Sequence, residues 1–291
     1  MQRENQHSDS LYPALPPIEF PPGMVWLIGA GPGDPSLLTL QGAQALARAD
    51  IIVHDSLVSP KLLRWRQDAE IVFAGKRGGK ASPSQADISL RLIEFSRKGH
   101  RVARLKGGDP FVFARGGEEA LALVRAGVPI RVTPGVTAGI GGLAYAGIPL
   151  THRDTNQSVT FITGHDHTGS APAAIDWASL AKGSQVLVMY MAMKHFSAIA
   201  SELMRAGRAP AEPVAVIAQA TLPGQVTLES SLGQAVADIA RHGLQAPAII
   251  CVGHNARLRM AIDWYAALTG GESRTSEPLG PDAPAKWGGI W

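Results

Sequence analysis

Residues 25–40, VWLIGAGPGDPSLLTL, place a short apolar run directly before a turn rich in glycine and proline. An apolar run of this length is typical of a strand buried on both faces, and glycines after it let the backbone approach a ligand closely. The spacing G-x-G-x-G, interrupted by Pro32 and Pro35, departs from the G-x-G-x-x-G fingerprint of dinucleotide-binding folds. The stretch therefore predicts a strand and a tight turn, and it disfavours an NAD(P)-binding oxidoreductase.

Outward from this stretch, β-branched runs alternate with helical patterns, which is typical of βαβ construction and predicts an α/β fold. Strands are predicted at residues 24–28, 51–54, 70–74, 101–105, 130–132, 158–163, 185–190, 213–218, 226–229 and 248–252. Helices are predicted from near residue 84, with Ser82 as N-cap, and at 194–206, 232–241 and 254–268. The short gap between 213–218 and 225–230 favours an antiparallel pair there.

These patterns divide the chain into two α/β domains with tails at both ends. We assign a disordered N-terminal tail to 1–22, an N-terminal α/β domain to 23–133, an inter-domain segment to 134–153, a C-terminal α/β domain to 154–269 and a flexible C-terminal tail to 270–291. The longest uncharged apolar stretch, 132–150, contains two prolines and five glycines. It therefore predicts a loop and a buried helix rather than a membrane span.

Composition narrows the function classes. The 27 Lys and Arg nearly balance the 24 Asp and Glu, so the dense basic stripe of a nucleic-acid binder is missing. Cys251 is the one cysteine, which excludes an intrachain disulfide and favours a reducing, cytoplasmic location. The 32 glycines and 21 prolines must mark disorder, tight turns or backbone close to a ligand.

Two further glycine clusters follow predicted strands. Residues 106–119, KGGDPFVFARGGEE, combine four glycines with five charged residues. Pro110 favours extended backbone at Asp109, and Arg115 offers a rigid fork for a carboxylate. Residues 133–139, TPGVTAG, supply small side chains suited to a narrow pocket. Since α/β proteins bind ligands at the carboxyl ends of strands, we expect the three clusters to face one site.

Other constellations are weaker. The sequence HDH at 165–167 has no further ligands at metal-site spacing, so no metal site is predicted. Asp55, after a predicted strand, could be catalytic, although no G-x-S-x-G elbow indicates a hydrolase. Met189, Met191 and Met193 alternate, which predicts one strand face for core packing or for lining a pocket.

The motifs resemble, in order along the chain, those of the uroporphyrinogen-III C-methyltransferases of the tetrapyrrole methylase family. The resemblance covers residues 24–268 and runs through VWLIGAGPGDPSLLTL, RLKGGDPFVFARGGEE, VTPGVTAGIGGLAYAGIPLTHRD, VLVMYMAM and PVAVIAQATLPGQ. It implies a homodimer of two α/β domains with S-adenosylmethionine in the cleft between them. The implied reaction methylates uroporphyrinogen III at C2 and C7, giving precorrin-2 via precorrin-1 and S-adenosylhomocysteine, for sirohaem, cobalamin or haem d1 synthesis. Neither a metal, a nucleic acid nor a membrane is implied.

The resemblance also implies site residues. For the cofactor these are Pro32, Gly107, Gly108, Asp109, Val112, Thr137, Ala138, Met191 and Ala220. For catalysis they are Asp55, Lys76, Arg115 and Glu118, and for the tetrapyrrole Arg115, Glu118, Arg153 and Met191. A guanidinium is a better carboxylate clamp than a base. We therefore expect Arg115 to orient the substrate and Glu118 or Asp55 to take a proton.

Some positions depart from the family pattern: His54 stands where tyrosine is common, and Ala114, Ala192 and Ala220 where glycine is usual. The 22-residue tail leads us to expect no fused dehydrogenase and ferrochelatase module before the domain. Three alternatives stay open: a methylase acting on a later precorrin, an NAD(P)-binding oxidoreductase and a non-catalytic ligand-holding module.

Overall fold

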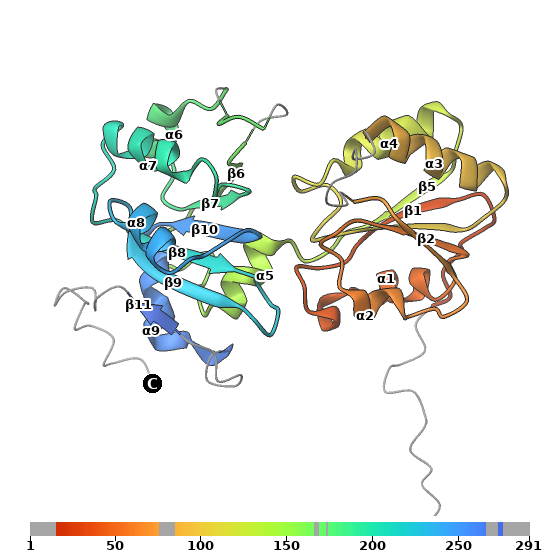
Figure 1. The fold of residues 1–291 in the computed structure, drawn as a ribbon, viewed down its shortest axis with the longest axis horizontal. Coiled ribbons are helices and arrows are strands. Elements are labelled where there is room, and N and C mark those ends of the chain that lie inside the picture. The colour runs from red at the N-terminus through yellow and green to blue at the C-terminus, as the bar shows by residue number, and fades with distance from the viewer. Residues whose placement is uncertain (1–15, 76–84, 166–168, 173, 266–272, 276–291) are drawn as a thin grey trace, which may run out of the picture.

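The computed structural model describes residues 16–75, 85–165, 169–172, 174–265 and 273–275. Two β-sheets, each with helices packed against it, lie side by side (Figure 1). The segment that joins them contains helix α5 (Ala138–Tyr145), which lies between the two halves in Figure 1. The α/β fold expected from the alternating pattern is confirmed.

The first sheet is parallel throughout. Its strand order is β3 (Glu70–Phe73), β2 (Ile51–His54), β4 (Val102–Lys106), β1 (Val25–Gly29) and β5 (Ile130–Thr133). Its helices are α1 (Leu40–Leu46), α2 (Pro60–Leu63), α3 (Gln85–Arg97) and α4 (Gly116–Arg125), and a short 3₁₀ turn, η1 (Pro35–Leu37), precedes α1. Figure 1 shows α1 and α2 on one face and α3 and α4 on the other. Because the strands are parallel, the loops after β1, β2, β4 and β5 meet at one edge.

The second sheet is mixed. Its order is β11 (Ser273–Thr275), β9 (Val226–Ser231), β8 (Pro213–Ala218), β10 (Ala248–Val252), β7 (Leu187–Tyr190) and β6 (Thr160–Thr163). The expected antiparallel pairing of β8 with β9 is confirmed. The helical segments are α6 (Trp177–Gly183), α7 (Phe196–Arg205), α8 (Ala235–Arg241), η2 (His254–Leu258) and α9 (Arg259–Ile262).

The buried core explains the unbroken apolar runs. In β1, Trp26 and Ile28 pack into one cluster while Val25 and Leu27 pack into another, so both faces of the sheet are covered. Leu143 of α5 packs against the second sheet, with residues of β7, β8 and β10. The connecting helix is therefore part of the hydrophobic core of the second half.

Three expectations need correction. Residues 16–22 belong to the predicted disordered tail, yet Phe20 is buried and its ring lies edge-on to Trp26 at 5.1 Å. Residues 273–275, in the predicted flexible tail, pair with β9. The helix predicted over 254–268 is divided: η2 and α9 cover residues 254–262, Asp263 interrupts them with a φ of −70° and a ψ of 69°, and helical backbone resumes at residues 264–265, beyond which the predicted range lies outside the described residues. Trp264 and Tyr265 donate hydrogen bonds to backbone carbonyls of α5 and of the loop after β8. The N-cap expected at Ser82 lies outside the described residues.

Among the described residues, no helix combines the length and the apolar character needed to cross a bilayer.

Candidate functional site

The three glycine clusters meet at the carboxyl edge of the first sheet. The loops after β1 and β4 pair through two backbone bonds, from Gly31 N to Gly108 O at 3.2 Å and from Gly108 N to Gly31 O at 2.7 Å. A Cβ on Gly29 would lie 2.5 Å from the backbone nitrogen of Gly135 and 2.7 Å from the carbonyl oxygen of Gly108. These glycines therefore permit a close approach of three backbone segments, and the expectation that the clusters share one edge is confirmed.

Replacing Gly135 by alanine is expected to disrupt this edge. The added Cβ would lie 2.2 Å from the carbonyl oxygen of Gly108, and neither backbone can retreat without moving its loop. Overpacking of this kind costs about 1 to 3 kcal/mol or more of folding free energy. Gly117→Ala is the matched control, because its Cβ would meet nothing within 4 Å and an alanine near the start of α4 stabilises by about 0.5 to 1 kcal/mol. Urea unfolding curves check both, and equal stability of the two variants would contradict the close packing of the three loops.

Asp109 fixes the loop after β4. Its Oδ2 accepts a hydrogen bond from Gly135 N at 2.9 Å, and its Oδ1 accepts one from Phe111 N at 2.8 Å. The extended backbone expected before Pro110 thus places the carboxylate between two loops. Both oxygens bond protein backbone, so Asp109 shapes the edge on which a ligand would rest.

Tyr190, the last residue of β7, joins the second half to this edge. Its hydroxyl lies 2.8 Å from Thr137 Oγ1 and accepts a hydrogen bond from Gly139 N at 2.8 Å. Its ring centroid lies 4.9 Å from that of Phe113, in the loop after β4. Val112, Ala138 and Ala220 pack with Tyr190 in one hydrophobic cluster. The structure therefore brings together predicted cofactor residues from both halves.

Strained backbone gathers in the same loops. Among the described residues, the non-glycine residues with positive φ have values between 50° and 65°; they are Phe113, Arg115, Met191, Gln219 and Thr221. All five lie in the loops that follow β4, β7 and β8. Such backbone costs free energy and is concentrated at functional sites.

The prediction that the three methionines lie on one face of a strand is wrong. β7 ends at Tyr190, so only Met189 lies in the strand, where it is buried. Met191 has left-handed backbone, which breaks the alternation, and its side chain is 43% exposed. Met191 therefore lies in the loop after β7 with its side chain accessible to a ligand.

Arg115 and Glu118 form an exposed ion pair at the start of α4. Arg115 Nε lies 2.9 Å from Glu118 Oε1, and Arg115 Nη2 lies 2.7 Å from Oε2. Both side chains are more than half exposed. The hydrogen bond and charge of Arg115 hold the pKa of Glu118 below its usual value. Glu118 is therefore ionised at neutral pH, and its two oxygens accept two hydrogen bonds from the guanidinium fork of Arg115.

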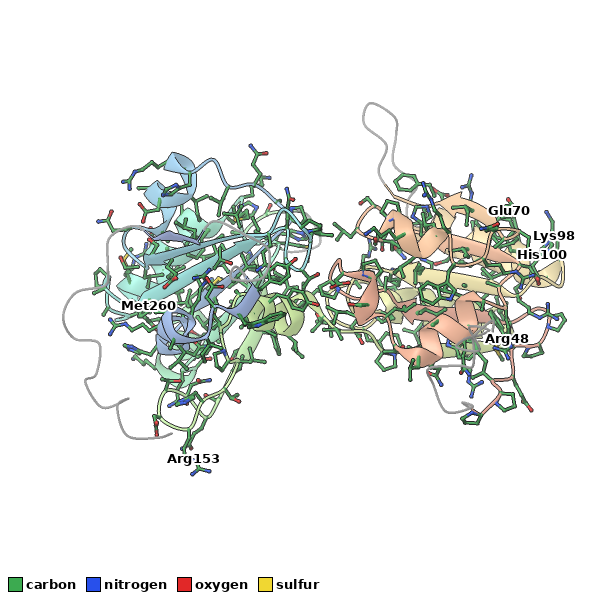
Figure 2. The ribbon with its side chains drawn as sticks, turned by 90° about the horizontal axis from the view of Figure 1, so that it is seen from below. Arg48, Glu70, Lys98, His100, Arg153 and Met260 are labelled. Carbon is green, nitrogen blue, oxygen red and sulfur yellow. The ribbon has the colours of Figure 1, made fainter. Side chains whose placement is uncertain are left out.

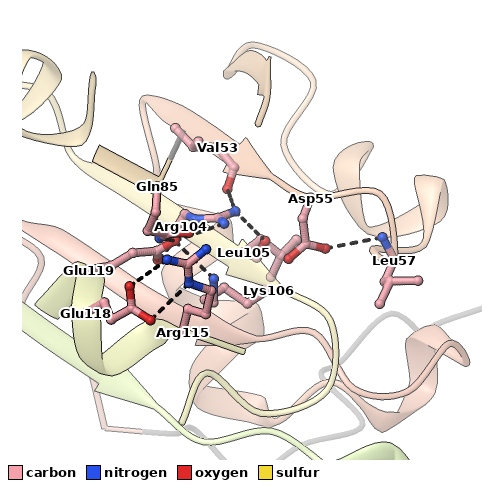
Figure 3. Close-up of polar contacts among 10 residues, drawn as sticks. All are labelled: Val53, Asp55, Leu57, Gln85, Arg104, Leu105, Lys106, Arg115, Glu118 and Glu119. Carbon is pink, nitrogen blue, oxygen red and sulfur yellow. Dashed lines mark hydrogen bonds and ion pairs between the residues drawn. The ribbon is translucent and has the colours of Figure 1, made fainter. Parts of the chain in front are cut away.

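Beneath this pair lies a buried charged cluster that the sequence reasoning missed (Figure 3). Glu119 is fully buried, and its Oε1 accepts hydrogen bonds from Lys106 Nζ at 3.1 Å and Arg104 Nη2 at 3.1 Å. Gln85 Nε2 donates to the same oxygen at 2.8 Å. Burial would raise the pKa of Glu119, but the two cations outweigh it and lower that pKa, while burial and Arg104 lower the pKa of Lys106. The available signal was a cation, Arg104, inside the strand predicted at 101–105, with Lys106 directly after it.

The remaining residues predicted for catalysis or substrate binding do not all lie at this edge of the first sheet. Asp55 follows β2, and its Oδ1 accepts a hydrogen bond from Leu57 N at 3.2 Å; its charge also acts on Lys106. Arg153 lies on an exposed loop, and Figure 2 shows its side chain projecting away from the second half. Lys76 lies outside the described residues. Asp55 thus lies at the carboxyl edge of the first sheet, whereas Arg153 lies away from that edge.

No group of three or more histidine, cysteine, aspartate or glutamate side chains suited to a metal ion occurs in the described part of the chain. His165 is described, whereas Asp166 and His167 are not.

Solved structures share this fold. The uroporphyrin-III C-methyl transferase of Thermus thermophilus, complexed with S-adenyl homocysteine, matches with a TM-score of 0.71 and 37% identity, over 81% of this chain and all of that one. A cobalt precorrin-4 methyltransferase matches with a TM-score of 0.72 and 27% identity, over 80% of this chain and 96% of that one.

Sequence identity distinguishes between relatives more sharply than the structural matches do. A uroporphyrinogen-III C-methyltransferase from Sinorhizobium is 59% identical over 263 residues, which is 90% of this chain and 93% of that protein. A siroheme synthase from Zymomonas mobilis is 46% identical over 258 residues, 87% of this chain, and this chain matches about half, 53%, of its length. The sequence profile of the tetrapyrrole (corrin/porphyrin) methylases matches residues 24–236. The chain therefore belongs to the tetrapyrrole methylase family.

Proposed function

We propose that this chain is a uroporphyrinogen-III C-methyltransferase that uses S-adenosylmethionine. The observation that carries the proposal is the 59% identity with the Sinorhizobium enzyme, which extends over nearly the whole of both chains. In the proposed reaction, methyl groups pass to C2 and C7, and precorrin-2 forms via precorrin-1 for sirohaem, cobalamin or haem d1 synthesis. The proposed assembly is a homodimer, and the proposed reaction needs no metal.

The edge described above has the features that such a methyl donor needs. Close-packed glycines leave backbone rather than side chains facing a ligand, and the second half supplies apolar contacts through its cluster around Tyr190. The S-adenyl homocysteine in complex with the Thermus enzyme is the product expected of this donor. The residues proposed to hold the donor are Pro32, Gly107, Gly108, Asp109, Val112, Thr137, Ala138, Met191 and Ala220.

When bound, the donor supplies a sulfonium methyl group, so that the methyl–sulfur bond breaks as a pyrrole carbon forms its new carbon–carbon bond. The chain's own part is to position the tetrapyrrole, exclude water and take up the proton that the ring then loses. Arg115, exposed and paired with Glu118 at the start of α4, is placed to clamp a substrate carboxylate. Glu118 and Asp55 are the carboxylates proposed to accept the proton, and Glu118 is ionised as an acceptor must be.

Calorimetry separates this proposal from an oxidoreductase. The chain is expected to bind S-adenosylhomocysteine saturably and NADH not at all, because its first glycine turn lacks the dinucleotide fingerprint. Binding of NADH in place of S-adenosylhomocysteine would contradict the proposal.

Turnover assays distinguish the proposed function from that of a methylase that acts on a later precorrin. Since the two solved structures have nearly equal TM-scores, the fold does not choose between uroporphyrinogen III and a later precorrin. Anaerobic assays with each substrate do, and we expect turnover of uroporphyrinogen III alone. Turnover restricted to the later precorrin would reassign the enzyme, and binding of S-adenosylhomocysteine without any turnover would favour a ligand-holding module.

A further inference from the structure

A closed ring of hydrogen bonds joins the two halves beside the proposed cofactor site. Its members are Asp34 from the loop after β1, Tyr145 from the end of α5, and Thr221 and Gln225 from the loop between β8 and β9. The mechanism proposed above uses none of these four side chains.

Each member of the ring bonds the next. Asp34 N donates to Thr221 Oγ1 at 2.9 Å, and Thr221 N donates to Gln225 Oε1 at 2.7 Å. Gln225 Nε2 donates to the carbonyl oxygen of Tyr145 at 3.2 Å, and the Tyr145 hydroxyl donates to Asp34 Oδ2 at 2.8 Å. Together these hydrogen bonds order the segments that they join.

The ionic states of the ring suit these donor and acceptor roles. Burial acts to raise the pKa of Asp34, but hydrogen bonds from Ser36 and Tyr145 outweigh it and lower that pKa. Burial and the bond to Asp34 raise the pKa of Tyr145. At neutral pH Asp34 is therefore an ionised acceptor and Tyr145 a protonated donor.

The ring lies next to two residues proposed to contact the methyl donor. Pro32 precedes Asp34 by two residues, and Ala220 directly precedes Thr221. Both pack against α5: a Cβ on Gly141 would lie 2.8 Å from Pro32 Cγ, and one on Gly142 would lie 2.9 Å from Ala220 Cβ. Gly33, between Pro32 and Asp34, would bring a Cβ to 3.0 Å from the carbonyl oxygen of Ala220.

The backbone of the loop between β8 and β9 needs contacts that hold it in a strained conformation. Thr221 has a φ of 65°, and the neighbouring Gln219 has a φ of 50°. Such left-handed backbone persists in non-glycine residues only when surrounding contacts hold it. For Thr221 these contacts are its two ring bonds, through Oγ1 and through its backbone nitrogen.

We propose that Asp34, Tyr145, Thr221 and Gln225 are positioning residues for the methyl donor, and that their ring sets the spacing of Pro32 and Ala220 across the two halves. The inference rests on the proposed function, because that function assigns these two residues to the donor. The ring would act on the donor through the loops that it fixes.

The test is calorimetric titration of S-adenosylhomocysteine into the full chain and its variants without tetrapyrrole. Tyr145→Phe removes one hydroxyl from the ring and is expected to weaken binding about 3- to 10-fold, the range of one lost hydrogen bond. Thr221→Ala is expected to do the same, and Thr221→Ser, which keeps the acceptor oxygen, to restore binding. In turnover, Tyr145→Phe is expected to raise KM for the donor and to leave KM for the tetrapyrrole unchanged.

Tyr265→Phe is the matched control. Its ring packs against Tyr145 at 4.9 Å, and its hydroxyl donates to Leu222 O at 3.3 Å, outside the ring of four. Unchanged affinity in Tyr145→Phe, or an equal loss in both tyrosine variants, would overturn the inference alone. Failure of the wild-type chain to bind S-adenosylhomocysteine would overturn the proposed function and the inference with it. A lower melting temperature with unchanged affinity would make the ring structural only and would also overturn the inference.

Discussion

Arg115→Lys is expected to lower kcat/KM for uroporphyrinogen III by about 10- to 100-fold, the loss that follows from a charged hydrogen bond worth about 1.5 to 3 kcal/mol. A lysine keeps the charge but loses the fork that binds a carboxylate through two parallel bonds. In the structure Glu118 engages this fork through two oxygens, and the substrate carboxylates would compete for the same donors. The loss should appear mainly in KM for the tetrapyrrole, while the affinity for S-adenosylhomocysteine stays unchanged.

Arg48→Lys is the control for this substitution. Arg48 donates a hydrogen bond to the carbonyl oxygen of Gln44, and it lies on the side of the first half that is remote from the second half (Figure 2). Full turnover by Arg115→Lys would contradict the role of Arg115 as a clamp. Glu118→Gln then separates two roles. If Glu118 accepts the proton, kcat falls; if it only orients Arg115, KM rises.

Glu119→Gln is expected to destabilise the fold by about 3 to 5 kcal/mol, the usual cost of breaking a buried ion pair from one side. Arg104 and Lys106 would remain buried with no carboxylate between them, and both side chains are less than 5% exposed. Urea unfolding followed by circular dichroism measures the change in free energy.

Lys106→Met is the comparison variant. It leaves Arg104 and Glu119 as a balanced pair and removes the second buried cation, so a smaller loss is expected. If Lys106→Met destabilised the fold as much as Glu119→Gln, the idea that one carboxylate neutralises two cations would be wrong.

Local sequence carries much of this fold. Apolar runs such as residues 25–28 predict strands well, because a parallel sheet covered on both faces requires unbroken hydrophobicity. The glycines at 29, 108 and 135 could be assigned to one edge, because parallel strands end on the same side. The first inference needs only local hydrophobicity, and the second needs only the position of each glycine after its strand.

Contacts between distant segments could not be predicted in this way. Arg104 and Lys106 lie in a buried strand because Glu119 meets them from α4, and no local pattern announces that pairing. The alternation at 189–193 failed because Met191 takes left-handed backbone. The helix expected over 254–268 is interrupted at Asp263, after which Trp264 donates to the carbonyl oxygen of Ala144, 120 residues away. A contact between distant segments explains the buried charges of β4, and local departures of the backbone explain the other two differences.

The identity of the methyl acceptor is the point on which the proposed function depends most. Anaerobic incubation of the chain with uroporphyrinogen III and S-adenosylmethionine labelled with ¹³C in its methyl group, followed by NMR of the tetrapyrrole, tests it directly. The proposed function predicts two labelled methyl groups, at C2 and C7, and the absorbance of precorrin-2 or its oxidation product. An unlabelled tetrapyrrole from a chain that binds S-adenosylhomocysteine, or label at any other ring position, would contradict it.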